Sequence, residues 1–426
     1  MKTASLRTFL IIAVSAAAPI LNGCGPQSTA VSPGVGRQSL QGATTEHVIL
    51  SFTGKGDGSY PSVGLIRDAA GSLYGATDSG GDRKCLIGCA IVYKLVPGLN
   101  DQWNEQVLHN FSNGTGISKL TLDRAGNLYG AAAIGGPGSN CFVGCGFIFE
   151  LAHTSGGRWV KRDLYDFYGY NGSGPSGAPL FDKAGNLYGN AGGSSNAHGL
   201  IFQLVPSKSG LWKERILHQF QGNDGSQPAG GLAFDARGNI YGATVNGGHS
   251  DCSVGCGTVF QLSPAGSGWT FKSIHAFSKK GGFWPPAGVV VDSRGNLYGT
   301  TVYGGSSDYG VVFELVGSSR WREKVLHSFA GGVDGGYPND TVTLDDPGNI
   351  YGTTQLQGAD GKGVAFELQP NQSGAWNEVV LHAFSGGHRD GTYPYSGLTF
   401  GRDKRLYGTT RAGGLRRKGV VYAETP

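Results

Sequence analysis

Seven cysteines carry the most evident chemistry of this 426-residue chain. Thiolates could bind a metal ion, but no paired histidines accompany them, and the segments that hold them are not all adjacent in the repeat pattern described below. Cys24 stands apart near the N-terminus, and the even number of the remaining six cysteines favours disulfides in a chain that we expect to be exported. We therefore expect one short-range disulfide within each of three pairs that share a spacing of four positions: Cys85 and Cys89, Cys141 and Cys145, and Cys252 and Cys256.

A second chemically capable group recurs in a predicted loop, where an acidic residue precedes an aromatic residue or a proline. The acids are Asp57, Asp224, Asp334 and Asp390, and the aromatic residues that stand directly before proline are Tyr60, Trp284, Tyr337 and Tyr393. Aromatic faces beside carboxylates would suit a sugar ring at a concave surface. The alternative is structural, because an Asp-Gly turn followed by a proline is a rigid turn. We treat these eight residues as candidate ligand-binding residues.

Five histidines recur in a Leu-His-x-Phe pattern: His109, His218, His275, His327 and His382. We expect them to occupy a structural strand position, because the strands that carry them point away from one another. No nucleophile elbow, zinc-protease helix, phosphate-binding loop or calcium loop is found in the sequence. The sequence therefore predicts no catalytic residue, no metal and no cofactor.

The elements that must position these residues follow from a long internal repeat. A Leu/Ile-Tyr-Gly core recurs at Leu73, Leu128, Leu187, Ile240, Leu297, Ile350 and Leu406. Each copy is flanked by short apolar runs that read as four strands, with turns of Asp, Gly and Asn between them. A four-stranded antiparallel unit repeated at this period is typical of the blade of a β-propeller.

The two ends of the chain indicate that the propeller is a closed ring. The chain ends at Pro426, soon after the third strand of its last unit, and the matching fourth strand stands at 47–52. A ring uses both, since the N-terminal strand completes the last blade and leaves no open sheet edge. We predict an all-β fold, a seven-bladed β-propeller over residues 45–426, with the first strand of each blade innermost.

The repeat also resembles a known family. The motifs LHxF, DGxxP, DxxGNLYGTT and GxVFxL recur in order with a GG-containing loop, and together they resemble the GloVer tandem repeat of bacterial extracellular proteins with various surface anchors. The resemblance implies location and architecture, and it carries over no catalytic residue. The last unit departs from the pattern at 401–405, where we expect a different turn.

The N-terminus predicts export. Lys2 and Arg7 precede an apolar segment from Thr8 to Leu21, and Cys24 follows in a sequence that resembles a bacterial lipobox. We expect a lipoprotein signal peptide over residues 1–23, then a lipidated Cys24 and a flexible tether over 24–44. Cleavage after Ala18 by an ordinary signal peptidase is the alternative. The expected location is the outer membrane or cell surface.

Composition limits the class of partner. The net charge is +4 and charged residues make up 15% of the chain, which does not favour nucleic-acid binding. We expect a monomer held at the membrane by its lipid. The leading hypothesis is a binding or interaction scaffold of the cell envelope for a carbohydrate or a surface protein. The alternatives are an enzyme acting on extracellular polysaccharide, as a glycoside hydrolase or lyase, and a purely structural surface protein.

Overall fold

The computed structural model describes residues 47–81, 89–112, 115–138, 140–193, 198–207, 212–248, 251–317 and 320–426. All of these lie in the compact unit formed by Thr44–Pro426. The signal segment, Cys24, the tether and Cys85 lie outside the described residues. Within the described residues, no helix has the length and hydropathy that a membrane crossing requires.

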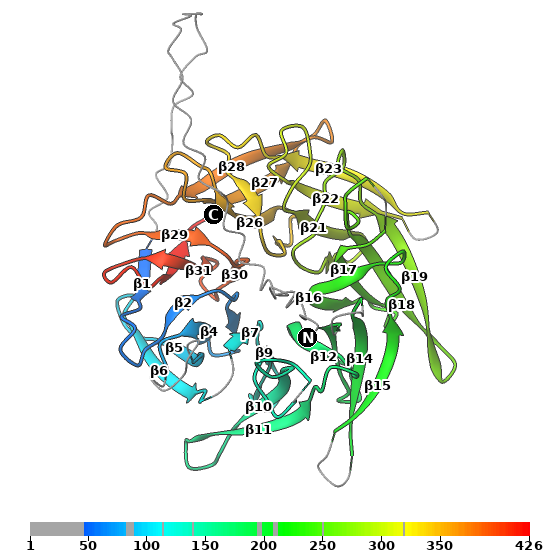
Figure 1. The fold of residues 1–426 in the computed structure, drawn as a ribbon. Helices are drawn as coiled ribbons and strands as arrows, with labels where there is room; N and C mark the ends of the chain where they lie inside the picture. Colours follow the sequence, from blue (N-terminus) through cyan, green and yellow to red (C-terminus); the bar gives the residue numbers. More distant parts are fainter. Residues whose placement is uncertain are drawn as a thin grey trace, which may run out of the picture. The chain divides into compact units, whose positions relative to one another are not determined.

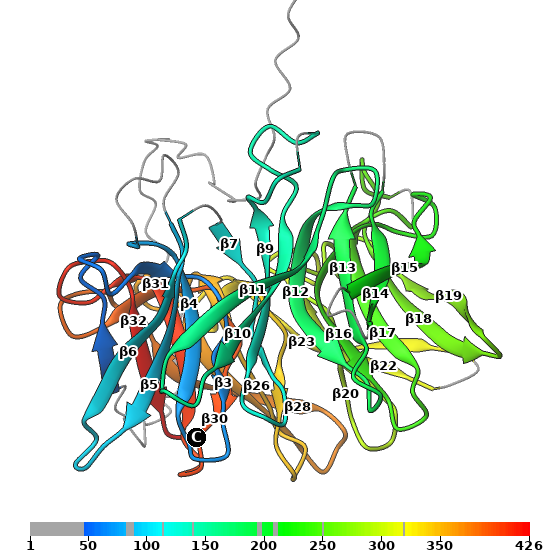
Figure 2. The same ribbon diagram turned by 90° about the horizontal axis from the view of Figure 1, so that it is seen from below.

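Seven sheets of mainly antiparallel strands follow one another around a ring, as Figure 1 shows. Each sheet is one blade, and blade 1 is the blade that contains β2, so that β1 belongs to blade 7. Inner strands lie around the ring axis and fourth strands at the periphery, which confirms the predicted strand order. Seen from the side, the strands of the blades run roughly along the ring axis (Figure 2).

Every blade has four strand positions, from the inner strand near the axis to the outer strand at the periphery. The strands at each position are named here in the order of blades 1 to 7. The inner strands are β2 (Ser59–Pro61) with β3 (Ile66–Arg67), β7 (Thr115–Ile117) with β8 (Thr121–Leu122), β12 (Ser173–Phe181), β16 (Ser226–Phe234), β20 (Val290–Val291), β24 (Gly336–Pro338) with β25 (Thr343–Leu344), and β29 (Gly391–Pro394) with β30 (Thr399–Phe400). The second strands are β4 (Leu73–Ser79), β9 (Leu128–Ile134), β13 (Leu187–Gly192), β17 (Ile240–Asn246), β21 (Leu297–Thr301), β26 (Ile350–Leu356) and β31 (Leu406–Gly413). The third strands are β5 (Ile91–Pro97), β10 (Phe147–His153), β14 (Leu200–Pro206), β18 (Thr258–Ala265), β22 (Val311–Val316), β27 (Val364–Pro370) and β32 (Val420–Glu424). The outer strands are β6 (Trp103–Asn110), β11 (Trp159–Asp166), β15 (Trp212–Gln219), β19 (Gly268–Ala276), β23 (Arg322–Ser328), β28 (Trp376–Ala383) and β1 (His47–Ser51).

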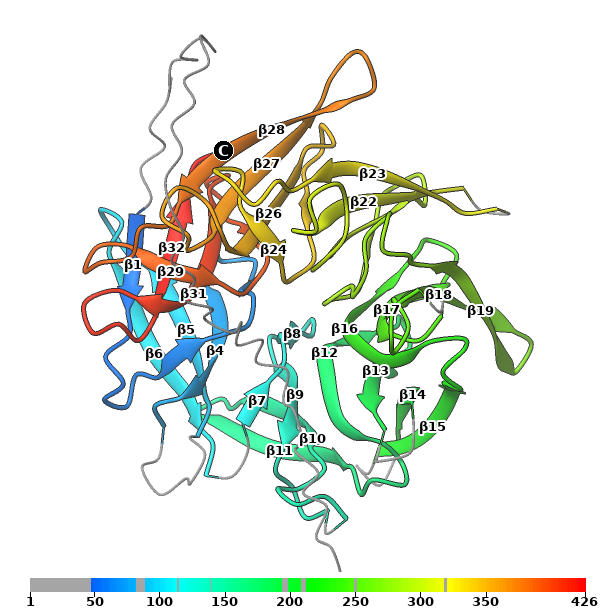
Figure 3. The same ribbon diagram turned by 45° about the horizontal axis from the view of Figure 1, so that its top comes forward.

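The ring is closed as predicted, by pairing the first strand of the chain with the last. β1 pairs antiparallel with β32, and Figure 3 shows the blue β1 beside the red strands of blade 7. Phe52 is fully buried after β1, and its N–H donates to the carbonyl of Gly419. The ends of the chain thus share one sheet, in which β1 pairs with β32 and is itself the outermost strand of blade 7.

The repeated tyrosines are packing elements, as expected. Tyr298 is buried among apolar residues of blade 6, and its hydroxyl donates to Asp292 at 3.3 Å and Glu314 at 2.9 Å. Asp292 also accepts from the backbone of Asn296, which closes the turn before the second strand. Burial and these carboxylates raise the pKa of Tyr298. The same motif therefore forms the turn and the contact between blades.

The apolar core is divided among the blade junctions. Seven clusters of buried residues each combine side chains from two consecutive blades. In one of them Tyr407 of blade 7 packs with Leu73 and Tyr93 of blade 1. Because every blade buries its faces against both neighbours, no blade has a complete core by itself.

The inner strands correct one expectation. The sequence predicts loops at the aromatic-proline segments, but Tyr60–Pro61 lies in β2, Tyr337–Pro338 in β24 and Tyr393–Pro394 in β29. The pairing of the inner strand with β4 is then interrupted. Pro61 pairs with Thr77 and Ile66 pairs with Tyr74, so the four residues 62–65 of the inner strand lie opposite only two residues of β4, 75 and 76. Proline is tolerated here because the inner strand is the edge of its sheet.

The turn of the last unit differs as expected. Asp403 stands four residues before Tyr407, and its carboxylate accepts from the hydroxyl of that tyrosine at 2.8 Å. Lys404 takes a positive φ of 66° in this turn, at the position that Gly295 occupies in blade 5. Arg405 pairs with Asp403 and, across the junction, with Asp101 of blade 1 at 2.6 Å. The altered turn therefore adds a contact where the ring closes.

Candidate functional site at the centre of the ring

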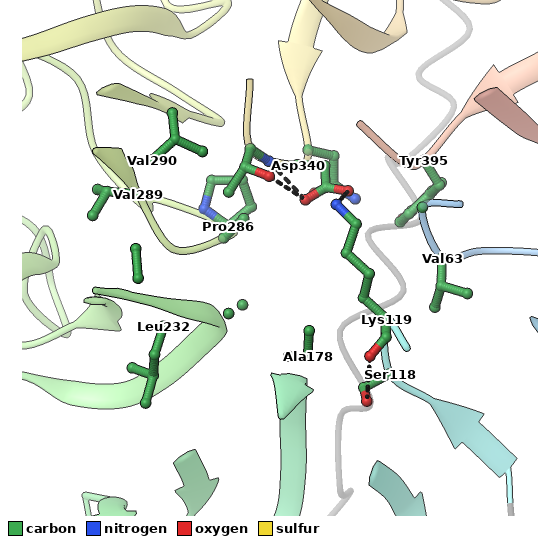
Figure 4. Close-up of a pocket in the computed structure, with 18 of the residues that line it drawn as sticks. Val63, Ser118, Lys119, Ala178, Leu232, Pro286, Val289, Val290, Asp340 and Tyr395 are labelled. Carbon is green, nitrogen blue, oxygen red and sulfur yellow. Dashed lines mark hydrogen bonds and ion pairs between the residues drawn. The ribbon is translucent and has the colours of Figure 1, made fainter. Parts of the chain in front are cut away.

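The interruptions of the inner strands surround an axial pocket. Its cavity volume is about 400 Å³, and residues from all seven blades line it, among them Val63, Lys119, Leu232, Asp340 and Tyr395. Figure 4 shows these residues arranged around a common space, with the side chains of Lys119 and Asp340 pointing toward one another. The pocket is lined mainly by small and apolar residues, so the few polar side chains in it are conspicuous.

The strand register shows where the blades differ around this pocket. In every blade the repeated tyrosine of the second strand pairs with one residue of the inner strand, and equivalent positions can be counted back from that residue. Two positions before it, blades 1 to 7 carry Gly64, Lys119, Ala178, Gly231, Gly288, Thr341 and Gly397. One residue earlier, they carry Val63, Ser118, Gly177, Gly230, Ala287, Asp340 and Ser396. Lys119 and Asp340 are the only charged residues in these two series. Two residues that line the pocket, Lys119 and Asp340, therefore depart from the pattern shared by the other blades.

These two residues form an ion pair across the pocket. Lys119 Nζ lies 3.7 Å from Asp340 Oδ2, and the side chains are 30% and 20% exposed. Asp340 is held by its surroundings, since its carboxylate accepts from the N–H of Thr341 at 2.7 Å and of Gly397 at 2.6 Å. A Cβ at Gly64 would lie 2.6 Å from Lys119 Cε. The small residue in blade 1 thus makes room for the lysine.

On the other side of the ring, the inner strands touch through their backbones. A Cβ at Gly177 would lie 1.9 Å from the carbonyl oxygen of Gly230, and one at Gly288 would lie 1.8 Å from that of Gly231. No other residue fits without moving a backbone. The centre is therefore narrowed by main chain on the side of blades 3 to 5 and crossed by the ion pair between blades 2 and 6.

Polar side chains of blades 7 and 1, namely Ser62, Asp78 and Arg411, lie together at the edge of the pocket. The hydroxyl of Ser62 donates to Asp78 at 2.5 Å, and Arg411 lies 3.8 Å from the same carboxylate. The guanidinium of Arg411 also stands over the ring of Tyr395, 5.4 Å from its centroid. Burial raises the pKa of Asp78, against the opposing effects of Ser62 and Arg411.

The predicted aromatic residues lie beside this pocket. Tyr60, Trp284, Tyr337 and Tyr393 all have positive φ, between 57° and 60°, and stand two residues before a pocket-lining residue. Each donates its N–H to a loop of the preceding blade, as Tyr337 does to the carbonyl of Tyr309 at 2.8 Å. Trp284 and Tyr337 both pack edge-on against Tyr303, which joins them in one aromatic cluster.

The predicted acids point elsewhere. Asp57, Asp224, Asp334 and Asp390 each accept backbone N–H groups of their own loop, as Asp334 does from Ala330 at 2.6 Å. Three of them also face a histidine of the adjacent outer strand: Asp224, Asp334 and Asp390. Their described bonds therefore fit the turn-capping alternative, and none of these bonds joins an acid to one of the four aromatic residues.

A polar cluster at the blade junctions was not anticipated. Its first member is a histidine on the outer strand of one blade, and its second is the acid in the loop that leads from that strand into the next blade. Its third member lies on the outer strand of the next blade, two residues after the tryptophan. Between blades 5 and 6 these are His327, Asp334 and Glu378. Burial and then Asp334 raise the pKa of Glu378 to about 8, while burial lowers that of His327. The Trp-x-Glu spacing was the sequence signal for the third member.

Two of the three expected disulfides lie entirely in the described residues. Cys141 and Cys145 are bonded in the loop between β9 and β10, with Cα atoms 5.2 Å apart. Cys252 and Cys256 are bonded in the matching loop of blade 4, at 5.1 Å. Cys89 is also disulfide-bonded, and its expected partner Cys85 lies outside the described residues. The disulfide interpretation is confirmed for the Cys141–Cys145 and Cys252–Cys256 pairs.

Comparison with solved structures supports the fold alone. PorZ, described as an essential bacterial surface component of the type-IX secretion system of Porphyromonas gingivalis, is 14% identical with a TM-score of 0.51, and the match covers 88% of this chain and 48% of PorZ. A gluconolactonase from Xanthomonas campestris is 13% identical with a TM-score of 0.41, covering 74% of this chain and 88% of that one. A Dyadobacter fermentans protein of unknown function is 12% identical with a TM-score of 0.45, covering 90% and 99%.

Comparison of the sequence is more specific. A search of curated proteins finds no significant match. The family described as the Gloeobacter/Verrucomicrobia repeat matches residues 37–254 and 250–426, which together span the whole ring. The repeat that defines this family is the one that forms the blades, so the match and the architecture agree. The chain therefore belongs to the Gloeobacter/Verrucomicrobia repeat family.

Proposed function

We propose that this protein is a lipid-anchored binding protein of the bacterial cell envelope, and that its ligand occupies the axial pocket. The observation that carries the proposal is the departure of Lys119 and Asp340 from the small residues of the other blades. A residue needed only for packing would be expected in every blade. Two opposite charges placed at a pocket where the other copies have small residues are better explained by recognition.

The chemistry of the pocket favours a sugar as the ligand. Lys119 offers ammonium donors and Asp340 offers carboxylate acceptors, and Asn339, whose side chain is an amide, also lines the pocket. Sugar hydroxyls can donate to the carboxylate and accept from the ammonium. Tyr395 supplies an aromatic face for the apolar side of a sugar ring. The proposed ligand is a sugar unit of an envelope or extracellular glycan.

The sequence supports the proposed anchor. The apolar segment from Thr8 to Leu21 and the lipobox-like sequence that ends at Cys24 predict lipidation of that cysteine. Mass analysis of the mature N-terminus tests this, with a diacylglyceryl-modified Cys24 expected. A Cys24→Ser variant should move from the membrane fraction to the soluble fraction. An unmodified mature chain that begins at Pro19 would contradict the anchor and leave the pocket proposal standing.

Binding to a glycan array, followed by calorimetry with the best ligand, tests the pocket. We expect Lys119→Ala and Asp340→Ser, which introduce residues found at the same positions in blades 3 and 7, to weaken binding at least tenfold. Lys272→Ala is the matched control, because Lys272 is an exposed lysine on the outer strand β19. Its affinity should equal that of the unmodified protein.

Three outcomes would overturn the proposal. No glycan binding at all would favour the structural surface protein or a protein partner. Binding that both pocket variants retain would place the ligand elsewhere. Release of reducing ends from the bound glycan, with loss of release in the same variants, would make the protein an enzyme. Circular dichroism of each variant shows whether it remains folded.

A further inference from the structure

The junction between blades 5 and 6 brings an imidazole and two carboxylates together. His327 lies on β23, Asp334 in the loop after it and Glu378 on β28, and their ligand atoms lie within 4.8 Å of one another. His327 Nε2 is 3.7 Å from Asp334 Oδ2 and 3.6 Å from Glu378 Oε2. These separations are too long for hydrogen bonds. The three groups converge without binding one another.

Part of this cluster lacks a hydrogen-bonding partner. His327 Nε2 and Glu378 Oε1 are both inaccessible to solvent and have no hydrogen-bond partner. Among the described residues, no lysine or arginine forms an ion pair with Asp334 or Glu378. Asp334 is nevertheless fixed, because its oxygens accept from the N–H groups of Ala330 and Gly332. Buried polar atoms that are held in place without partners require an explanation.

We propose that this cluster is a binding site for a divalent transition-metal ion of the Zn²⁺ class. A tetrahedral ion at about 2.0–2.1 Å from its ligands places them about 3.4 Å apart. The two separations from His327 Nε2 then need to contract by only about 0.3 Å, and the two carboxylates lie within 4.8 Å of each other. One imidazole and two carboxylates suit such an ion better than Ca²⁺ or Mg²⁺, which prefer oxygen ligands alone. Three protein ligands leave the fourth tetrahedral position to a water molecule.

Two other junctions of the same ring each lack one ligand. Between blades 4 and 5, His275 lies 3.4 Å from Glu323, but the loop after β19 carries Lys279 and Lys280 and no acid. Between blades 3 and 4, His218 binds Asp224 at 2.8 Å. There the glutamate is replaced by Phe271, whose ring stacks on the histidine at 3.5 Å. These junctions are internal controls for the proposed site.

The ion would join the outer parts of two blades. Its ligands come from β23, from the loop that leads into blade 6 and from β28, so bound metal would cross-link blades 5 and 6 at the periphery. Because metal binds the folded chain and not the unfolded one, it should raise the melting temperature in proportion to the logarithm of its free concentration. The site is distinct from the axial pocket and does not depend on its ligand.

Calorimetry and thermal unfolding of the metal-stripped full-length protein test this inference. We expect one Zn²⁺ per chain and a rise in melting temperature with added Zn²⁺, with little response to Mg²⁺ or Ca²⁺. Glu378→Gln and His327→Gln should each weaken Zn²⁺ binding at least tenfold. His275→Gln is the matched control and should bind Zn²⁺ as the unmodified protein does, because its junction lacks the acid.

X-ray absorption of the zinc-loaded protein gives a second readout, with one imidazole and oxygen ligands expected. Absence of stoichiometric Zn²⁺ binding to the unmodified protein would overturn the inference. Equal binding by the Glu378→Gln and His275→Gln variants would also overturn it, by placing the ion elsewhere. A response to Ca²⁺ or Mg²⁺ equal to that of Zn²⁺ would contradict the assigned class of ion. Glu378→Gln is close to isosteric, so a folded ligand variant should be obtainable.

Discussion

Glu105 shows what the polar blade junctions do to a single side chain. It lies two residues after Trp103 on β6, at the junction of blades 7 and 1, where it faces Asp57 and the hydroxyl of Tyr93. Burial, and then the charge of Asp57, raises the pKa of Glu105 from 4.5 to about 7. Asp57 cannot turn away to relieve the repulsion, since the N–H groups of Thr53 and Lys55 hold its carboxylate.

This shift makes stability depend on pH in a defined direction. Between pH 4.5 and about 7 the folded chain holds a proton on Glu105 that the unfolded chain has lost, so the free energy of unfolding falls as pH rises. We predict that Glu105→Gln raises this free energy at pH 8 by about 1 kcal/mol, a figure reduced for partial exposure, and changes it little at pH 4.5. Urea unfolding at the two values checks it. The exposed substitution Asp346→Asn should shift neither value, and parallel pH curves for Glu105→Gln and the unmodified protein would refute the assignment.

At the scale of the element, the inner strands are distinguished by direct backbone contact. Gly288 of blade 5 lies against the carbonyl of Gly231 on β16, and Gly230 of that strand lies against Ala287 and Gly288. Inner strands of a propeller converge, so the space between them is smallest at the axis. Glycine is required at these contacts because backbone meets backbone, and neither side can give way as a flexible side chain would.

Gly288→Ala should therefore be strongly destabilising. Its new Cβ would lie 1.8 Å from the oxygen of Gly231, which forces the two inner strands apart. We predict a loss of about 3 kcal/mol in the free energy of unfolding, as for severe overpacking. Gly268→Ala on β19 is the control, since its Cβ would meet nothing closer than 3.6 Å. Equal urea midpoints for the two variants would contradict this prediction, because they would show that the inner strands can move apart to accept a Cβ at Gly288.

The elements were predictable where one local motif sets them. The tyrosine core marks the second strand of each blade, and the aspartate six residues before Tyr298 closes the preceding turn through its own side chain. The interruption between Pro61 and Ile66 was not predictable, because it depends on which residues of β4 the two halves of the inner strand face. Periodicity fixes which strands exist, while register is fixed by packing against the neighbouring blades.

At the scale of the whole molecule, the proposed binding site lies where the ring brings distant copies of the repeat together. Lys119 and Asp340 belong to blades 2 and 6 and meet because the chain closes on itself through β1. In the sequence each is a single departure from a repeat, without a motif around it. The aromatic residues could be predicted near the centre because they recur, whereas the ion pair could not, since its two members are matched only by the geometry of closure.

This ion pair should connect the two sides of the ring energetically. We predict a coupling of about 0.5–1 kcal/mol between Lys119→Ala and Asp340→Ser in a double-mutant cycle on unfolding, since the pair is only partly exposed. The coupling should shrink in 1 M salt, where charges are screened within about 3 Å. Lys119→Ala combined with the distant Asp346→Asn should be additive. Additivity of the pocket pair would mean that Lys119 and Asp340 do not stabilise the ring, and weakened glycan binding in the same variants would then assign them to recognition alone.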